Sequence, residues 1–338
     1  MPAFRTGTVT AILADRPGLQ RIEVDGRPAY VLTELIGPVA VGDRVVVNTT
    51  AVDLGLGSGG WDVVHWNLEV EEWSAPGTGH VMKLRYTSLQ ADTGVVEESA
   101  SYAPPPHLGG APVVACSVHS QLPCVAAVVK HLAPRARVAH VMTDGGALPL
   151  ALSDLVAAMR DVGMLDVTVT AGQAFGGDLE AVNVPSALEV ARVAGRADVI
   201  IAAPGPGIVG TGTPRGFSSL EVAGVLDSAA LLGAVPVVAL RWSDADPRER
   251  HRGLSHHSST ALRHTHAPVT VPVPAGQDLP DVAPHRVVAV DVPDVAELLR
   301  RSGLRVTTMG RGPEEEPRFF AYAGAAGAYA GRALEPRR

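Results

Sequence analysis

The sequence predicts an α/β protein with an N-terminal small β-barrel-like module followed by a mainly parallel, doubly wound α/β domain. Up to about residue 90 the chain contains short β-branched runs separated by turns, which is typical of an all-β module. After residue 112, apolar runs of about six residues alternate with helical stretches, as in the β-α-β units of a parallel sheet. The 338 residues also exceed the ~250–300 residues at which a single core stops growing. Two domains are therefore expected.

The N-terminal module is predicted to occupy residues 1–96. Its expected strands have the sequences GTVTAIL, RIEVDG, AYVLTEL, DRVVVNTT, WDVVHW and KLRYTSL. The glycine run GLGSGG at 55–60 precedes WDVVHW, which is a strand pattern, whereas a dinucleotide-binding loop needs a helix there. We therefore expect a hairpin or surface loop at 55–60. Residues 97–111 are rich in proline and glycine and indicate an exposed linker.

The α/β domain is predicted at residues 112–338. Six continuously apolar runs indicate strands buried on both faces, at residues 112–118, 136–143, 166–170, 198–204, 236–241 and 286–292. Capping patterns that predict helix starts pair Ser186 with Glu189, Ser218 with Glu221 and Asp294 with Glu297. Glycines that predict helix ends are Gly163, Gly195, Gly233 and Gly303. The segment FFAYAGAAGAYAG has small residues at helical spacing, which predicts a closely packed terminal helix or a subunit contact in a homo-oligomer.

Composition argues against several classes of protein. The chain has 28 basic and 35 acidic residues, a net charge of −7, which disfavours binding to nucleic acid or to an anionic membrane. The sequence shows neither a signal-peptide pattern nor an apolar run of about 18 residues that could span a bilayer. Cys116 and Cys124 cannot build a disulfide framework and are expected to be small buried hydrophobes. We expect a soluble, cytoplasmic protein.

A ligand site is predicted at one edge of the parallel sheet. In open α/β sheets ligands bind beyond the carboxyl ends of the strands, where helix N-termini converge. The segments that follow the predicted strands are all polar or glycine-rich, whereas the opposite connections are ordinary. The polar and charged residues in these segments include His119, Asp144, Asp178, Glu180, Arg241 and Asp244.

The loop 205–213 resembles an anion cradle, because closely spaced glycines allow backbone N–H groups to point at one ligand. It has no lysine where a P-loop would need one, so nucleotide hydrolysis of that kind is disfavoured. The residues predicted to bind an anion are Gly205, Gly207, Gly210, Thr211, Thr213, Arg215, Arg241 and Arg252. The alternative is a flexible connection between a strand and a helix.

Histidines are concentrated between residues 251 and 266, which contain five of the twelve. Neutral imidazole binds metals and also transfers protons near pH 7. We consider Asp144, His119, His256 and His257 for acid–base catalysis, and Asp178, Glu180 and Asp244 as ligands of a divalent metal, Zn or Mn. Because His256 and His257 are adjacent on a predicted helix, at most one is expected to contact a metal. A metal-free acid–base cluster and a solvated loop remain alternatives.

Other nucleophiles are less favoured. The sequence contains no G-x-S-x-G pattern, which disfavours a serine hydrolase with a nucleophile elbow. Lys83 and Lys130 are the two lysines in a chain that otherwise uses arginine, and Lys83 is a secondary candidate for a required residue.

Several blocks of the chain resemble an uncharacterised bacterial protein family that is known only as a domain of unknown function. The blocks are GHVMKLRYTSLQ, HVMTDGGALP, GQAFGGDLEAVNV, GPGIVGTGTPRGFS and DADPRERHRGLSHHS. The resemblance covers nearly the whole chain and implies no particular activity.

Two functional hypotheses follow. In the first, the protein is an enzyme acting on a small anionic substrate, with metal-dependent hydrolysis as the nearest reaction class and with Arg241, Arg248, Arg250 or Arg252 as counter-charge. In the second, it is a non-catalytic subunit for ligand binding or assembly that uses the same edge. Nucleic-acid binding by the β module is a third option, which the acidic composition disfavours.

Overall fold

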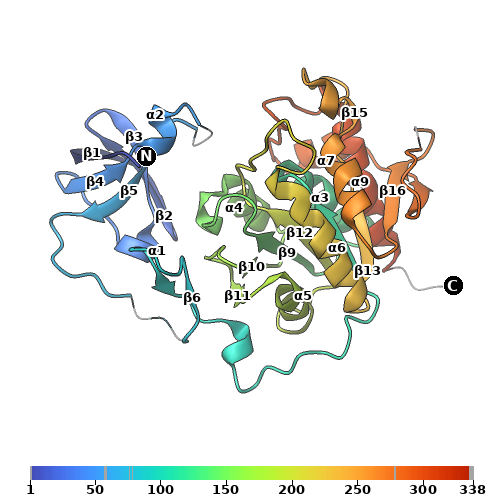
Figure 1. Ribbon diagram of the computed structural model, residues 1–338, viewed down its shortest axis with the longest axis horizontal. Helices are drawn as coiled ribbons and strands as arrows, with labels where there is room; N and C mark the ends of the chain where they lie inside the picture. The colour runs from blue at the N-terminus through green and yellow to red at the C-terminus, as the bar shows by residue number, and fades with distance from the viewer. Residues whose placement is uncertain (1, 57–58, 76, 78, 278, 335–338) are drawn as a thin grey trace. The chain divides into compact units, whose positions relative to one another are not determined.

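The computed structural model describes residues 2–334 apart from 57–58, 76, 78 and 278 (Figure 1). The chain forms two compact units, residues 1–94 and 95–338. The predicted boundaries around the linker at 97–111 stay a prediction. Leu108, inside that segment, is buried, and its N–H donates to the carbonyl of Leu232. The centre of the glycine run at 55–60 lies outside the described residues.

The first unit contains a closed five-stranded barrel with the strand order β1-β2-β3-β5-β4. Its elements are β1 (Phe4–Arg16), β2 (Leu19–Val24), β3 (Arg27–Val31), α1 (Thr33–Ile36), β4 (Arg44–Asn48), α2 (Thr50–Asp53), β5 (Asp62–Asn67), β6 (Met82–Lys83) and β7 (Ala91–Asp92). Alternate residues such as Ile22, Val24, Val45 and Val47 point inward and form the barrel core. The β-branched runs therefore predicted a barrel correctly.

One predicted strand of this unit is almost absent. The segment KLRYTSL contributes only its first residue, Lys83, to the two-residue strand β6, which pairs with β7. Leu84 and Tyr86 have φ values of 53° and 61°, in the left-handed region, so an extended strand cannot continue through them. The side chains of this segment favour a strand, but its backbone forms a turn instead.

The second unit contains an eight-stranded, all-parallel sheet flanked by helices, which confirms the predicted fold class. The sheet order is β11-β10-β9-β12-β8-β13-β16-β17. Its strands are β8 (Pro112–Cys116), β9 (Val138–Thr143), β10 (Val167–Ala171), β11 (Leu179–Ala181), β12 (Val199–Pro204), β13 (Val235–Ala239), β16 (Thr270–Pro274) and β17 (Arg286–Val290). Two further short strands, β14 (Trp242–Ser243) and β15 (Gly253–Leu254), pair with each other.

Helices cover both faces of this sheet. They are α3 (Leu122–Leu132), α4 (Asp154–Asp161), α5 (Val184–Val193), α6 (Val222–Leu231), α7 (His256–His264), α8 (Val295–Arg301) and α9 (Pro317–Arg332). Short 3₁₀ turns are η1 (Val96–Glu98), η2 (His119–Gln121), η3 (Leu150–Leu152), η4 (Ser218–Glu221) and η5 (Glu249–His251). Helices α3, α4, α8 and α9 contribute to one apolar cluster, and α5, α6 and α7 contribute to the other.

The chain changes faces at the middle of the sheet. Strands β8 and β9 are followed by helices on one face, whereas β12, which lies between them, is followed by α6 on the other face. Loops that leave adjacent strands in opposite directions open a crevice at the carboxyl edge, where ligands bind in open α/β folds. The structure therefore places the polar segments after these strands around such a switch point.

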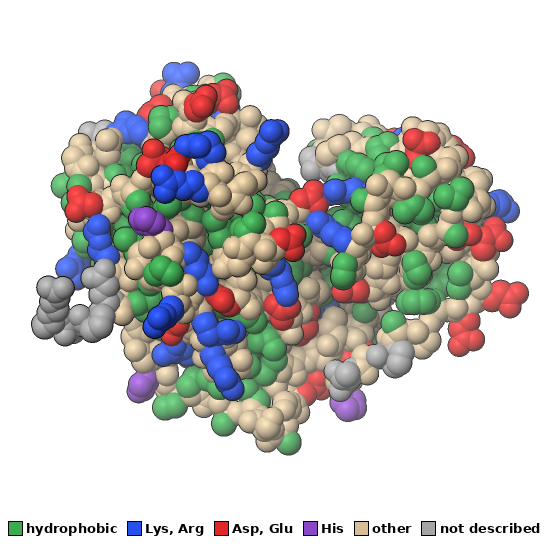
Figure 2. Space-filling view, turned by 180° about the vertical axis from the view of Figure 1, so that it is seen from behind, with side chains coloured by type: hydrophobic (Ala, Val, Ile, Leu, Met, Phe, Trp, Pro, Cys, Tyr) green, Lys and Arg blue, Asp and Glu red, His purple; other side chains and the backbone are tan. Residues whose placement is uncertain are grey.

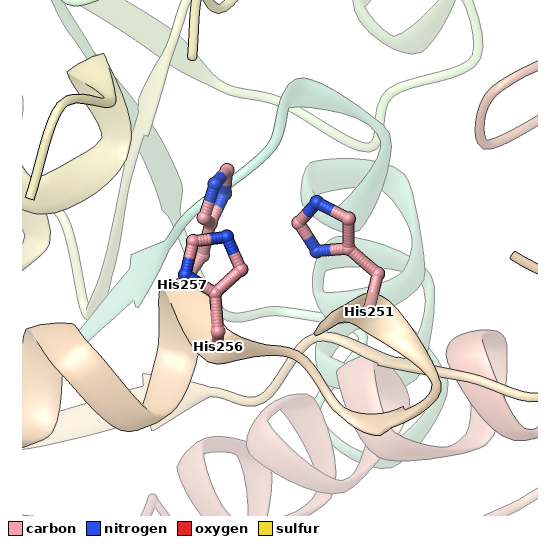
Figure 3. Close-up of side chains that lie close together, drawn as sticks. All are labelled: His251, His256 and His257. Atoms are coloured by element: carbon pink, nitrogen blue, oxygen red, sulfur yellow. The ribbon is translucent and has the colours of Figure 1, made fainter. Parts of the chain in front are cut away.

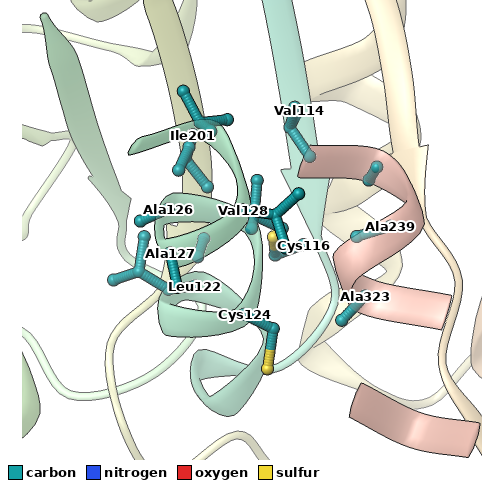
Figure 4. Close-up of a cluster of buried hydrophobic side chains, with 14 of the residues drawn as sticks. Val114, Cys116, Leu122, Cys124, Ala126, Ala127, Val128, Ile201, Ala239 and Ala323 are labelled. Atoms are coloured by element: carbon teal, nitrogen blue, oxygen red, sulfur yellow. The ribbon is translucent and has the colours of Figure 1, made fainter. Parts of the chain in front are cut away.

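Both cysteines lie in the core beside α3. Cys116 and Cys124 are free, buried thiols packed among side chains such as Leu122, Val128 and Ala323 (Figure 4). Burial raises the pKa of both thiols far above the ordinary value. They behave as small hydrophobes, as the sequence predicted.

Three local predictions need correction. Strands β11 and β16 were missed, β16 because Pro272 and Pro274 argue against a paired strand. The helix predicted to start at Ser186 begins at Val184 and is capped by Asn183. Ser218 caps no helix; η4 starts there instead. The cap at Asp294 is confirmed, because its side chain accepts a hydrogen bond from the N–H of Glu297 at 3.0 Å.

The small residues of α9 serve packing within the chain. A Cβ at Gly327 would lie 2.5 Å from the carbonyl oxygen of Val125 on α3, and a Cβ at Gly324 would lie 2.5 Å from Val295 on α8. Glycine is therefore needed for this close approach of helices. None of the helices in the described residues is both long enough and apolar enough to cross a membrane.

Candidate metal centre at the carboxyl edge

Three histidines converge beyond the carboxyl end of β13. His251 ends η5, and His256 and His257 begin α7, whose N-cap is Ser255 (Figure 3). Each imidazole offers one nitrogen, and these nitrogens all lie within 4.8 Å of one another. In the described part of the chain, this is the one group of three or more His, Cys, Asp or Glu side chains with such spacing.

His256 and His257 lie side by side although adjacency on a helix was expected to separate them, and the prediction that at most one of them contacts a metal stays a prediction. Their ring centroids lie 4.4 Å apart, and both rings face His251 at centroid distances of 4.9 and 4.8 Å. Both residues are in the first turn, so no preceding turn of helix separates their side chains from the space at the N-terminus, toward which helical Cβ atoms tilt. Helical spacing alone argued against proximity of these two rings, but the first turn of a helix permits it.

Serine hydroxyls hold two of the three rings. Nδ1 of His251 lies 2.8 Å from Oγ of Ser255, and Nδ1 of His257 lies 3.3 Å from Oγ of Ser219. When these Nδ1–H groups donate to the serines, the Nε2 lone pairs are left to bind a ligand. Nε2 of His256 is buried and has no hydrogen-bond partner in the described structure. This arrangement is the usual one for metal-binding histidine, in which one nitrogen is anchored and the other is available.

All three imidazoles are neutral at neutral pH. Burial and, next in size, the nearby guanidinium of Arg241 together lower the pKa of His251 and of His257 to about 3. The pKa of His256 is lowered by burial and then by Arg250. Since only neutral imidazole can coordinate a metal, the site is in its binding-competent form without losing protons.

The loop predicted to bind an anion lies against these histidines. Phe217 stacks on His257 with 4.0 Å between ring centroids and presents its edge to His256 at 5.5 Å. A Cβ placed on Gly210 would lie 3.7 Å from Nε2 of His257. Phe217, which follows the loop 205–213, therefore forms an apolar wall, and Gly210 of the loop faces the imidazoles.

A buried ionic network adjoins the imidazoles. Asp246 is fully buried and accepts two hydrogen bonds from the Arg248 guanidinium, at 2.9 and 2.8 Å. Arg241 and Arg311 also approach Asp246, at 3.5 and 3.7 Å. Glu316, likewise buried, accepts a hydrogen bond from Nε of Arg311 at 2.8 Å. Three guanidinium groups thus face two carboxylates, which leaves the network positive.

The network also fixes the ionisation of its members. Hydrogen bonds from Arg248 hold the pKa of Asp246 well below its usual range, although burial opposes this. Burial lowers the pKa of Arg241 to about 10, so this side chain remains cationic at neutral pH. The backbone of Arg241 also contacts the start of α7, since its N–H donates to Oγ of Ser258 and its carbonyl accepts from the N–H of Ser255.

Other predicted residues lie at the same edge but are occupied in local contacts. His119 contacts the Pro204 carbonyl through Nδ1 at 2.9 Å and Oγ of Ser153 through Nε2 at 2.7 Å. Asp144 is exposed and accepts a hydrogen bond from the N–H of Gln173 at 3.1 Å. Arg252 donates to the carbonyl of Asp246 at 3.1 Å. Their predicted roles in catalysis and anion binding stay predictions.

The three acidic residues predicted as metal ligands are not grouped with the histidines. Asp178 accepts hydrogen bonds from Thr168 and Arg160, and Glu180 accepts one from the N–H of Gly176 at 2.7 Å. Asp244 accepts one from Nε1 of Trp242 at 3.2 Å and pairs with Arg318. Each carboxylate is engaged in contacts away from the three histidines.

Much of the predicted anion cradle is bonded within its own loop. The N–H of Thr211 donates to the carbonyl of Gly216 at 2.7 Å, and the N–H of Thr213 donates to Oγ1 of Thr211 at 3.2 Å. Arg215 is exposed. Backbone contacts also join Gly205 to the segment after β9, since a Cβ at Gly205 would lie 2.4 Å from the carbonyl of Ala147. These glycines allow two loops to approach, which is a structural reason for their presence.

Sequence reasoning missed two kinds of functional candidate. His251 lies in the histidine-rich run, but the sequence analysis does not name it as a catalytic residue or a metal ligand. The signal that could have indicated it is the presence of nearby serines, whose hydroxyls can hold an imidazole. Glu221 was interpreted as a capping residue, but its carboxylate accepts a hydrogen bond from Oγ1 of Thr143 at 2.6 Å. Burial raises the pKa of Glu221 to about 7. No local sequence pattern predicts this contact, because Thr143 and Glu221 are 78 positions apart.

A family model described as "Protein of unknown function (DUF3866)" matches residues 28–327 of the chain. The chain belongs to this family. The DUF3866 match starts within β3, so it leaves out β1 and β2 of the barrel, and it includes the whole parallel sheet and all three clustered histidines. No curated protein matches the sequence. Membership in the DUF3866 family thus groups the two units together and leaves the chemistry to be argued from the site.

Proposed function

We propose that the protein is a metal-dependent enzyme that acts on a small anionic substrate, with His251, His256 and His257 as ligands of Zn²⁺ or Mn²⁺. The observation that supports this most is the convergence of three neutral imidazoles within 4.8 Å. Neutral imidazole suits both ions. Metal-dependent hydrolysis is the nearest reaction class.

The three histidines suit Zn²⁺ or Mn²⁺ both in number and in the type of donor atom. Zinc binds histidine nitrogen at about 2.0–2.1 Å, which places tetrahedral donors about 3.4 Å apart. The three nitrogens all lie within 4.8 Å of one another, which is near that spacing. Three protein ligands leave one position open, as in catalytic zinc sites. A bound divalent ion supplies a Lewis acid that polarises an oxygen of the substrate.

The surroundings favour an anionic substrate. Arginines are the main charged groups acting on the imidazoles, and the buried network beside them is positive. Basic side chains also stand out on the surface of the larger unit, although the chain as a whole carries a net charge of −7 (Figure 2). A cationic substrate would be repelled, and an oxyanion would be attracted.

The experiment begins with protein purified without a histidine tag. Metal analysis and titration of the metal-free protein should give one Zn²⁺ or Mn²⁺ per chain, and the triple variant His251→Ala, His256→Ala, His257→Ala should bind none. The loaded protein should then hydrolyse members of a panel of small phosphate esters and N-acyl amino acids, and the triple variant should not. Absence of metal binding in the wild type, or equal binding in the folded triple variant, would refute the proposal.

A further inference from the structure

Positive charge around the three imidazoles opposes the entry of a cation. Arg250, Arg241, Arg248 and Arg263 all act on His256, and Arg241 and Arg248 also act on His251 and His257. The nearby carboxylate, Asp246, already accepts hydrogen bonds from Arg248 and approaches two further guanidinium groups. A divalent ion bound by three neutral ligands would therefore keep its full charge in a positive field. Such a site needs an added negative charge.

Two of these arginines are available to an anion. Arg250 and Arg263 are exposed, and neither forms an ion pair in the part of the chain that the structure describes, although the Arg263 guanidinium donates to Oγ1 of Thr260 at 3.2 Å. Arg250 directly precedes His251 on η5. Arg263 lies seven residues after His256 on α7, which is two helical turns along the same face. Planar guanidinium groups match the paired oxygens of phosphate and carboxylate.

We infer that the metal and an oxyanion bind to this site as a pair, with the oxyanion completing the metal coordination and contacting Arg250, with Arg263 as a second contact. The inference rests on the proposed function and assigns the substrate class: a small molecule with a phosphate or carboxylate group that reaches the metal. Each partner supplies the charge that the other lacks. By linkage, the anion raises metal affinity by the same factor by which the metal raises anion affinity.

The test uses the full chain, Mn²⁺ and inorganic phosphate. Free Mn²⁺ is measured by electron paramagnetic resonance during titrations with and without millimolar phosphate, and a protein-free titration corrects for complexes in solution. Phosphate should raise Mn²⁺ affinity about tenfold or more, within the 5–150-fold range of typical coupling. Phosphate binding, measured calorimetrically with and without Mn²⁺, should rise by the same factor. Acetate in place of phosphate distinguishes the two oxyanion classes.

Charge-neutralising variants locate the anion. Arg250→Gln should reduce the coupling severalfold while metal affinity without phosphate stays equal or rises, because a repulsive charge is removed. Arg263→Gln should act in the same direction with a smaller effect. Arg135→Gln is the matched control, since Arg135 is exposed on the loop before β9, at the amino ends of the strands, and should leave the coupling unchanged.

The outcomes separate this inference from the proposed function. Mn²⁺ binding that neither phosphate nor acetate changes would overturn the paired binding and leave the metal site intact. Full coupling in the double variant Arg250→Gln, Arg263→Gln would overturn the assigned contacts. If Mn²⁺ and Zn²⁺ fail to bind under every condition while phosphate binds alone, both the metal centre and the pairing are refuted.

Discussion

Two groups of histidines at the carboxyl side of the same sheet have similar burial and different surroundings. His140 on β9 is fully buried, and burial lowers its pKa to about 3, the same value as for His251 and His257. Its ring centroid lies 6.2 Å from that of His119. Both rings of this first pair contact backbone carbonyls of β12, those of Ile201 and Pro204. They are anchored to the sheet.

The second group differs in two respects. Two of its three rings contact serine hydroxyls and neither of these two contacts a backbone carbonyl, and one nitrogen of each ring lies within 4.8 Å of the other two. A charged network lies beside the second group, whereas His140 is influenced by the neighbouring His119. Burial and a lowered pKa thus occur in both groups and do not identify a site. The proximity of three nitrogens in the second group is the observation that supports the proposed site.

The largest expected effect comes from the network beside the second group. Asp246→Asn leaves the buried guanidinium of Arg241 without its carboxylate, and breaking a buried pair costs about 3–5 kcal/mol. Urea unfolding at pH 7 measures the loss. Glu249→Gln, at an exposed neighbouring position, should stay within about 0.5 kcal/mol of the wild type.

The pH dependence of that stability has a definite sign. The pKa of Asp246 is lower in the folded state than in the unfolded chain, so its stabilisation is present above the ordinary carboxyl pKa and is lost as pH falls through the lowered value. The difference between wild type and Asp246→Asn should therefore shrink in acid. A variant within about 1 kcal/mol of the wild type at pH 7 would show that the network is not stabilising.

The next effect separates the two groups by metal binding. His256→Ala removes the imidazole whose buried Nε2 has no partner, and Zn²⁺ affinity should fall at least about 100-fold, beyond the usual cost of losing an outer-shell contact. His119→Ala should leave Zn²⁺ affinity unchanged, because both nitrogens of His119 already have partners. Competition with a chromophoric chelator measures both. Equal losses of Zn²⁺ affinity in the two variants would contradict the assignment of metal binding to the second group of histidines.

Glu221 provides a smaller test in which burial shifts a carboxyl group. Its pKa is raised to about 7, so the stability it contributes is complete in acid and is lost as pH rises from its ordinary range through pH 7. Glu221→Gln keeps an acceptor for Thr143 and removes the buried charge. The variant should gain up to about 3 kcal/mol over the wild type at pH 8 and little at pH 4. Thermal unfolding at both pH values measures this; equal gains would contradict the shifted pKa.

The fold could be predicted where local pattern and burial agree. Continuous apolar runs such as Val199–Pro204 mark strands covered on both faces, and they predicted the centre of the sheet. β16 was not predicted because Pro272 and Pro274 each lack an N–H donor, yet it pairs with β17 from Thr270 to Pro274 and with β13 at Thr270. Pairing of this kind depends on neighbouring strands that the local sequence does not specify.

The sequence indicated where the candidate site lies in the fold, but not which residues contact one another there. The rule for parallel sheets located the carboxyl edge, and the histidine-rich run lies there. Contacts between distant residues could not be predicted. Ser219 contacts His257 from 38 positions away, and Glu316 accepts a hydrogen bond from Ser243, 73 positions away. These contacts arise when separate loops meet at one edge, and no spacing within a single segment encodes them.

The smallest expected effect compares the serines of the two groups. Ser219→Ala removes the partner of His257 Nδ1, so the ring is free to turn and Zn²⁺ affinity should fall about tenfold with little change in stability. Ser153→Ala removes the partner of His119 and also the N-cap of α4, so it should cost about 1 kcal/mol of stability without changing Zn²⁺ affinity. Chelator competition and urea unfolding on both variants give opposite patterns if the serines have these roles. If Ser153→Ala weakens Zn²⁺ binding as much as Ser219→Ala does, the first pair of histidines belongs to the metal site and its carbonyl anchors do not set it apart.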